Sequence, residues 1–244
     1  MVYFISDLHL GASYIADHRA HEVRVTAFLD SIACNATELY LLGDVLDYWY
    51  EYRTVVPRGY VRFFGVLARM ADAGVRITWL TGNHDIWLFD YLRDEIGLEV
   101  VDAPYVVREF DGRTFILAHG DRIGTRKASF RFICHLFRNR LCQKLYSAIH
   151  PRWTVGLAHG WSSASRKSSG YVPAGIETLV EREADALALT VPGTDYVVLG
   201  HHHIAHQARL PQSGAELIVL GDWIDKDTYA CWDGKTLTLE SFRR

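Results

Sequence analysis

Five short clusters of Asp, Asn and His residues each follow an apolar run of the chain. They are Ser6-Asp7-Leu8-His9, Gly43-Asp44-Val45-Leu46-Asp47, Gly82-Asn83-His84-Asp85, His119-Gly120-Asp121 and Gly200-His201-His202-His203. Carboxylate, amide and imidazole groups are typical ligands of the harder divalent metals, and none of the clusters contains Cys. The candidate ligands are Asp7, His9, Asp44, Asn83, His119, His201 and His203. Because one metal takes about three or four protein ligands, this set with one bridging carboxylate predicts two divalent ions.

A pair of divalent ions makes water acidic and holds phosphoryl oxygens, so the ligand set favours hydrolysis of a phosphoester or pyrophosphate. Any one of these clusters alone is more often a helix cap or a turn. Five of them at the ends of successive apolar runs make a coincidence improbable.

The first 120 residues alternate apolar runs with helical patterns, which predicts a largely parallel, buried sheet. Strands are expected at Val2–Ile5, Glu38–Leu42, Val75–Leu80, Thr114–Ala118 and Tyr196–Leu199, with helices at Arg19–Ala33 and Tyr60–Ala73. The carboxyl ends of such strands meet at one edge, where α/β proteins bind ligands. On an extended backbone Asp7 and His9 share a face, as do His201 and His203.

The last fifth of the chain follows a different pattern, with strands expected at Gln207–Leu210, Glu216–Leu220, Thr228–Trp232 and Thr236–Phe242. Asp233-Gly234 is a hairpin-turn signal, so these strands predict an antiparallel meander. The expected fold is therefore α/β, a two-sheet sandwich forming a single domain over residues 1–244.

A helical insertion at about residues 121–190 interrupts the strands. Residues 121–169 hold ten Lys or Arg and one acidic residue, a net charge of +9, whereas the rest of the chain carries −12. Between Phe130 and Ile149 the apolar spacing predicts one basic amphipathic helix. Such an insertion is either a lid that meets anionic lipid or phosphate, or an ordinary cap with a solvated basic face.

Other features of the chain favour a cytoplasmic protein, with a peripheral position on the inner face of the cytoplasmic membrane as a further expectation. The four cysteines form no CxxC pair, which is typical of reduced thiols. The N-terminus begins with a strand-like run and lacks the pattern of a signal peptide.

In order along the chain, Asp-x-His, Gly-Asp-x-x-Asp, Gly-Asn-His-Asp, His-Gly and Gly-His-x-His resemble the blocks of the calcineurin-like metallophosphoesterase superfamily, from Asp7 to His203. The resemblance implies the two-sheet sandwich of that superfamily and two metal sites, most often manganese. One site is implied to use Asp7, His9, Asp44 and His203, and the other Asp44, Asn83, His119 and His201. It also implies that His84 assists as a proton donor to the leaving group or by stabilising the transition state, and that Asp85 orients His84.

Within the superfamily the chain resembles the UDP-2,3-diacylglucosamine diphosphatases of lipid A biosynthesis. The resemblance rests on chain size, the helical lid after His-Gly-Asp, the Ser-rich run at residues 162–168 and the Val219–Trp223 ending. It implies a lipid-linked UDP-sugar substrate, cleaved to UMP and 2,3-diacylglucosamine 1-phosphate, with the acyl chains received by the lid. The implied substrate-binding residues are Asn83, His84, Ser163, Arg166, Lys167 and His201. One departure is His84, because the best-known branch of these enzymes has Arg at that position.

Two alternatives remain open from the sequence. The first is a soluble metallophosphoesterase acting on nucleotides or phosphodiesters. The second is a non-catalytic interaction module, like the retromer coat subunits with this scaffold, which typically lose the metal-site histidines that this chain retains. Nucleic acid is not expected as a partner, since the basic residues accompany bulky apolar ones and not an exposed aromatic platform. The sequence does not fix the oligomeric state.

Overall fold

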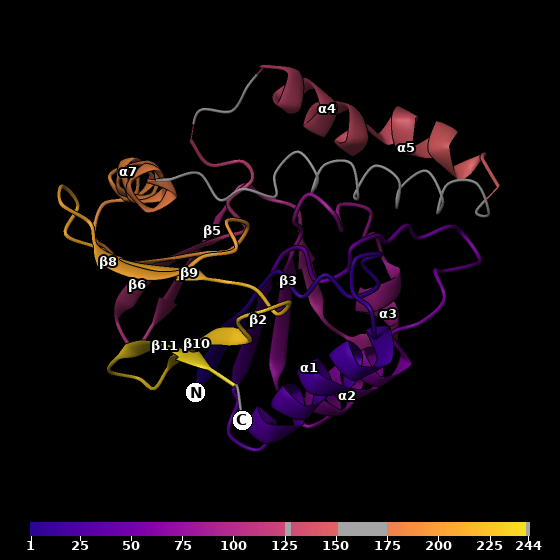
Figure 1. Cartoon of the computed structure of the whole chain (residues 1–244), viewed down its shortest axis with the longest axis horizontal. Helices are drawn as coiled ribbons and strands as arrows, with labels where there is room; N and C mark the ends of the chain where they lie inside the picture. The colour runs from indigo at the N-terminus through magenta and orange to yellow at the C-terminus, as the bar shows by residue number, and fades with distance from the viewer. Residues whose placement is uncertain (125–127, 151–174, 243–244) are drawn as a thin grey trace.

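The computed structural model describes residues 1–124, 128–150 and 175–242 and shows two β-sheets facing each other, with helices on their outer sides (Figure 1). The first sheet has the order β11-β10-β1-β2-β3-β4. Its strands are β1 (Val2–Ile5), β2 (Glu38–Leu42), β3 (Arg76–Leu80), β4 (Glu99–Val101), β10 (Thr228–Trp232) and β11 (Leu237–Ser241). Strands β1 to β4 run parallel, and β10 is antiparallel to both β1 and β11.

The second sheet has the order β5-β6-β7-β9-β8. Its strands are β5 (Val106–Phe110), β6 (Arg113–Ala118), β7 (Thr194–Leu199), β8 (Ala205–Arg209) and β9 (Glu216–Leu220). Strands β6, β7 and β9 are parallel, while β5 and β8 pair antiparallel at the edges. The predicted two-sheet α/β fold is confirmed.

Both faces of the central strands are buried, which explains their continuous apolar sequences. In β1, Tyr3 and Ile5 pack toward the helices, whereas Val2 and Phe4 pack between the sheets. The Phe4 ring lies 6.1 Å from that of Phe115 in the opposite sheet. This alternation fixes the register of β1, because a shift by one residue would exchange the two faces.

Helices α1 (His18–Ile32), α2 (Val61–Asp72) and α3 (Tyr91–Ile96) pack on the first sheet, and α7 (Ile176–Ala188) packs on the second. Helices α4 (Ala128–Arg138) and α5 (Arg140–Ser147) lie apart from these layers, at the top of Figure 1. They belong to the predicted insertion at about 121–190. The assignment of residues 1–244 to a single domain stays a prediction.

Two expectations about the elements are wrong. The C-terminal strands do not form one meander, because β8 and β9 join the second sheet while β10 and β11 join the first. The single helix expected from Phe130 to Ile149 is broken at Asn139, whose backbone is extended and whose side chain accepts hydrogen bonds from Leu141 N and Cys142 N. Asn competes well for backbone donors at a helix start, a local effect that apolar periodicity does not record.

The buried carboxylate of Glu51 ties the loop after β2 to the start of α3. It accepts hydrogen bonds from Trp49 Nε1 and from the backbone N–H groups of Phe89, Asp90 and Tyr91. Replacing Glu51 with Ala leaves these donors without that acceptor. We therefore expect the free energy of unfolding, measured in urea, to fall by about 3 kcal/mol. Glu95→Ala, an exposed position on α3, is the matched control and should change the free energy by less than about 0.5 kcal/mol.

Candidate metal centre

The five polar clusters follow β1, β2, β3, β6 and β7, and their loops meet at the carboxyl ends of these strands. The backbone there is not extended as expected. The residues with positive φ include Asp7, His9, Asp44, His201 and His203, with values between 45° and 68°. These side chains therefore reach the centre through left-handed turns, and the prediction of a shared strand face is wrong. Such a conformation is costly for non-glycine residues and is concentrated at functional sites.

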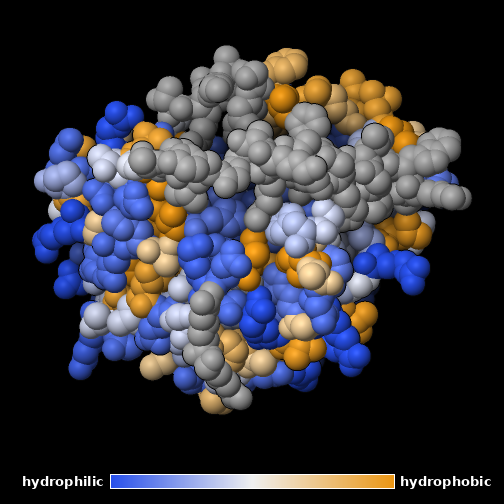
Figure 2. All heavy atoms as spheres, viewed as in Figure 1, coloured by the Kyte–Doolittle hydropathy of each residue, from blue (hydrophilic) through white to orange (hydrophobic). Residues whose placement is uncertain are grey.

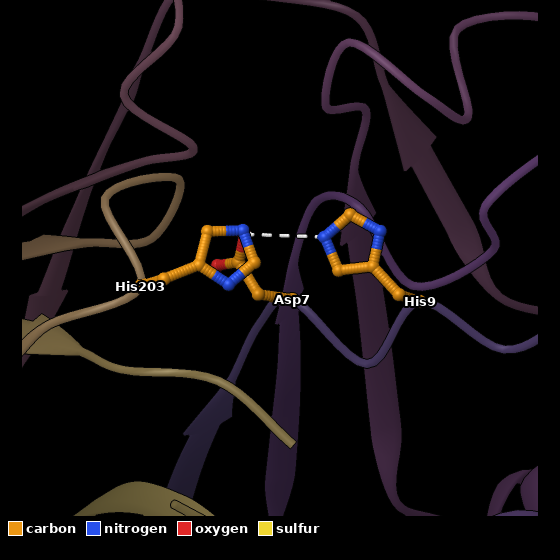
Figure 3. A group of neighbouring side chains, drawn as sticks. All are labelled: Asp7, His9 and His203. Atoms are coloured by element: carbon orange, nitrogen blue, oxygen red, sulfur yellow. Dashed lines mark ion pairs between the residues drawn. The ribbon is translucent and has the colours of Figure 1, made fainter. Parts of the chain in front are cut away.

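One group of side chains consists of Asp7, His9 and His203, whose potential ligand atoms lie within 4.8 Å of one another. The Oδ1 atom of Asp7 is 3.8 Å from His9 Nε2 and 3.5 Å from His203 Nε2. The His9 and His203 rings are stacked with their centroids 5.1 Å apart, and Figure 3 shows both of them beside Asp7.

A second group consists of Asp44, His119 and His201, with the same mutual spacing. Asp44 Oδ2 lies 3.3 Å from His119 Nε2 and 3.8 Å from His9 Nε2, so this one carboxylate stands between the two groups. Asn83 Oδ1 lies 3.4 Å from His119 Nε2 and adds an amide oxygen to the second group. The structure thus brings all seven sequence-predicted ligands together.

Asp7 and His9 are buried, yet Asp7 Oδ1 and His9 Nε2 have no hydrogen-bond partner among the described residues. An unsatisfied buried carboxylate oxygen beside an unsatisfied imidazole nitrogen costs free energy unless a further group binds both. A divalent cation meets this need, since both atoms are metal ligands. The residues present therefore fit the metals that the sequence predicts.

In this centre, the carboxylates and the imidazoles shift one another's pKa values. Burial would raise the pKa of Asp7, but His203 and His9 outweigh it and lower the pKa to about 2. Burial would lower the pKa of His119, but Asp44 raises it to about 10. The carboxylates thus stay ionised, and His119 would have to lose a proton before its imidazole could bind a metal ion.

His84 lies beside this centre, and its ring lies close enough to His9 and Asp44 for their potential ligand atoms to be within 4.8 Å of one another. Its Nδ1 atom lies 3.1 Å from the backbone carbonyl of Asp47 and 3.5 Å from the Asp47 carboxylate. The sequence assigned this orienting role to Asp85. The Asp85 carboxylate instead accepts hydrogen bonds from Val45 N, Trp79 Nε1 and Gly82 N, so it holds the loops in place while Asp47 orients His84.

Sequence reasoning did not assign a role to Asp222, which lies behind the first group. Its carboxylate is 3.7 Å from His203 Nδ1, accepts a hydrogen bond from Lys226 Nζ at 2.7 Å, and is 2 % exposed. Burial would raise its pKa, but His203 and Lys226 hold the pKa well below its usual range. A carboxylate behind a metal-binding imidazole fixes the orientation of the ring. The Gly221-Asp222 turn after an apolar strand was the available signal.

The predicted substrate-binding residues divide into two sets. Asn83, His84 and His201 lie at the centre. Ser163, Arg166 and Lys167 fall outside the described residues, so their assignment stays a prediction.

Comparison with known proteins gives consistent matches. Residues 1–205 match the family described as calcineurin-like phosphoesterase. A UDP-2,3-diacylglucosamine hydrolase from Porphyromonas gingivalis is 43% identical over 98% of this chain and 97% of its own length. A protein of the same name from Ralstonia nicotianae is 31% identical over 91% of this chain and 83% of its own. Among solved structures, a hypothetical protein from Pyrococcus horikoshii is similar with a TM-score of 0.47 and 12% identity, over 98% of this chain and 86% of its own.

Proposed function

The chain belongs to the calcineurin-like phosphoesterase family, and from that premise we propose that it hydrolyses the pyrophosphate bond of UDP-2,3-diacylglucosamine to UMP and 2,3-diacylglucosamine 1-phosphate. One observation carries the hydrolytic part: the Asp44 carboxylate stands between two groups of buried ligands. The substrate is supported by the names of near full-length relatives.

Two divalent ions, which we propose are Mn²⁺, supply Lewis-acid chemistry that gives a water nucleophile at neutral pH and offsets charge on phosphoryl oxygens. Asp7, His9 and His203 would hold one ion, and His119, His201 and Asn83 the other. Asp44 would serve both. The chain's own part is to keep these ligands fixed before substrate arrives, which avoids reorganisation during the reaction.

His84 is the proposed proton donor to the leaving phosphate. Because a carbonyl only accepts hydrogen bonds, the contact with the Asp47 carbonyl places a proton on Nδ1. Donation to the leaving group then requires a second proton on Nε2, so His84 would act as the imidazolium. The His84 side chain is 16% exposed, whereas that of His9 is 1% exposed, so His84 is accessible from outside the centre. We propose that Asn83 and His201 contact the substrate there, with Ser163, Arg166 and Lys167 contributing from the lid.

Replacing His84 with Asn is expected to lower kcat by about a hundredfold or more, since a positioned general acid contributes about 10²–10⁴. The metal content should stay within error of the native protein, because His84 is not among the proposed metal ligands. The rate of UMP formation checks the expected kcat, and metal analysis of the same preparation checks the metal content. Unchanged kcat would assign the leaving-group proton to another residue.

The substrate proposal is tested with purified protein, Mn²⁺ and UDP-2,3-diacylglucosamine in detergent micelles. The expected products are UMP and 2,3-diacylglucosamine 1-phosphate in equal amounts. Turnover of bis(p-nitrophenyl) phosphate without any UMP release would favour the alternative, a soluble phosphoesterase acting on nucleotides or phosphodiesters.

We also propose that α4 and α5 meet an anionic membrane surface. Phe132, Leu141 and Leu145 are about two-thirds exposed, and Figure 2 shows apolar atoms gathered at the upper right, where these helices lie. Residues 128–150 contain no acidic residue, and Arg140 and Lys144 are exposed beside the apolar side chains. Exposed apolar groups flanked by cations favour anionic lipid. Among the described residues, no helix has the length and apolarity to cross a bilayer.

Native protein is expected to float with phosphatidylglycerol vesicles at low salt. The double variant Leu141→Ser/Leu145→Ser should bind at least about tenfold more weakly, since each Leu contributes apolar burial worth about 1.5–3 kcal/mol. The control is Leu189→Ser, an exposed Leu beside α7, which should bind like the native protein. Flotation that is equal for all three proteins would contradict the assignment of this surface.

A further inference from the structure

The C-terminal end of α4 contacts both ends of one loop, residues 82–87, which we name the site loop. At its start, Arg138 Nη2 donates a hydrogen bond to the Gly82 carbonyl at 3.2 Å. At its end, Trp87 Nε1 donates to the Phe137 carbonyl at 2.9 Å. Two adjacent residues of α4 therefore hold the two ends of the site loop.

Both contacts are embedded in packed surroundings. The Arg138 side chain is 15% exposed, and its guanidinium also donates to Asp102 Oδ1 at 3.1 Å. The Trp87 ring is 9% exposed, and its centroid lies 4.7 Å from that of Tyr146 and 5.6 Å from that of Phe137. A buried hydrogen bond with restrained partners fixes geometry more closely than an exposed one.

The site loop carries Asn83 and His84 and is in close contact with the Asp44 carboxylate at Gly82 and His84. The His84 N–H donates to Asp44 Oδ1 at 2.9 Å. A Cβ placed on Gly82 would lie 2.2 Å from that same oxygen. Since the loop is in contact with the shared carboxylate, a displacement of a few tenths of an ångström at Gly82 or Trp87 reaches the metal ligands.

We propose that Phe137 and Arg138 form a clamp that positions the site loop, so that the lid completes the metal centre as well as covering it. Arg138 and Trp87 are then positioning residues, which act on the reaction through Asn83 and His84. The proposal rests on the proposed function only in treating these two residues as part of a hydrolytic centre.

The first test is amide hydrogen exchange on metal-free protein, which requires no activity. Arg138→Gln and Trp87→Phe should each raise exchange in residues 82–87 by about fivefold, the factor that one lost hydrogen bond gives. The control Arg93→Gln removes an exposed arginine of α3 that pairs with its neighbour Asp94, and exchange in the site loop should not change. Trp87→Phe removes the N–H donor and part of the ring system but keeps an aromatic side chain beside Phe137 and Tyr146, which limits the loss of packing.

The second test measures the Mn²⁺ concentration that gives half-maximal hydrolysis of bis(p-nitrophenyl) phosphate. Arg138→Gln and Trp87→Phe should each need about tenfold more Mn²⁺ and show a lower kcat, whereas Arg138→Lys should recover part of the loss. Unchanged exchange in the site loop, or an equal rise in β6 and β7, would overturn the clamp. If the native chain hydrolyses no phosphodiester or pyrophosphate, the proposed function fails and the exchange result alone decides on the clamp.

Discussion

Asp44→Asn is expected to reduce UMP release by more than about a hundredfold, the largest effect of any single substitution in this chain. Loss of a residue that only orients a metal ligand already costs about 10–100-fold, and Asp44 contacts both ligand groups directly. Asn suits the test better than Ala because φ of Asp44 is 52°, a conformation that Asn tolerates. The variant keeps the size of the side chain and removes its negative charge.

The control for this experiment is Asp72→Asn, an exposed carboxylate at the end of α2. It should retain native activity within about twofold. Asp44→Asn should remain folded by circular dichroism, because the change leaves the hydrophobic clusters intact. Activity above a tenth of the native value in Asp44→Asn would contradict the bridging role and with it the two-ion proposal.

Removal of divalent ions is expected to abolish hydrolysis completely and to lower the melting temperature. Without a cation, the centre keeps Asp7 Oδ1 and His9 Nε2 buried and unsatisfied, so ions that bind only the folded state stabilise it. Dialysis against EDTA followed by addition of Mn²⁺ should restore both activity and melting temperature. Addition of Mn²⁺ should restore activity and melting temperature less in Asp44→Asn than in the native protein, because the variant lacks the carboxylate between the two groups.

The same titration addresses the identity of the metal. Mn²⁺ is expected to restore more activity than Mg²⁺ or Zn²⁺ at equal free concentration, and calorimetry on the apoprotein should give about two ions per chain. A melting temperature that does not respond to any divalent ion, together with activity that survives EDTA, would rule out a metal-dependent reaction.

Much of the fold could be predicted from the sequence because the central strands are buried on both faces. Each strand from β1 to β3 is a short continuous apolar run, which few other elements resemble. Strand β4 has three residues, and β5 alternates between partly buried and exposed positions, so neither gave a comparable signal. Sheet membership at the C-terminus depends on contacts distant in sequence, and local patterns do not encode it.

The candidate centre could be anticipated because its clusters follow strands whose ends meet. The contacts around it could not, since they depend on loop conformation. Asp47 rather than Asp85 orients His84, because the loop after β2 turns the Asp47 carbonyl toward the ring. The Arg138 side chain packs against Gly82 and Asp102 and not into solvent, and helix periodicity does not predict such a contact. The left-handed turns could not be predicted either, because they occur at Asp and His residues, whereas the usual sequence signal for positive φ is glycine.

Those left-handed turns lower the thermal stability of the fold at the residues that the proposed activity requires. Each non-glycine residue held at positive φ adds about 1–3 kcal/mol of backbone strain, and five of the proposed ligands carry it. Glycine at His9 or His203 would relieve that strain but remove a proposed metal ligand, so the higher melting temperature is expected only in the metal-free protein, where no bound ion is lost. A thermostability screen of metal-free protein without an activity readout would therefore select against the ligands of the metal centre.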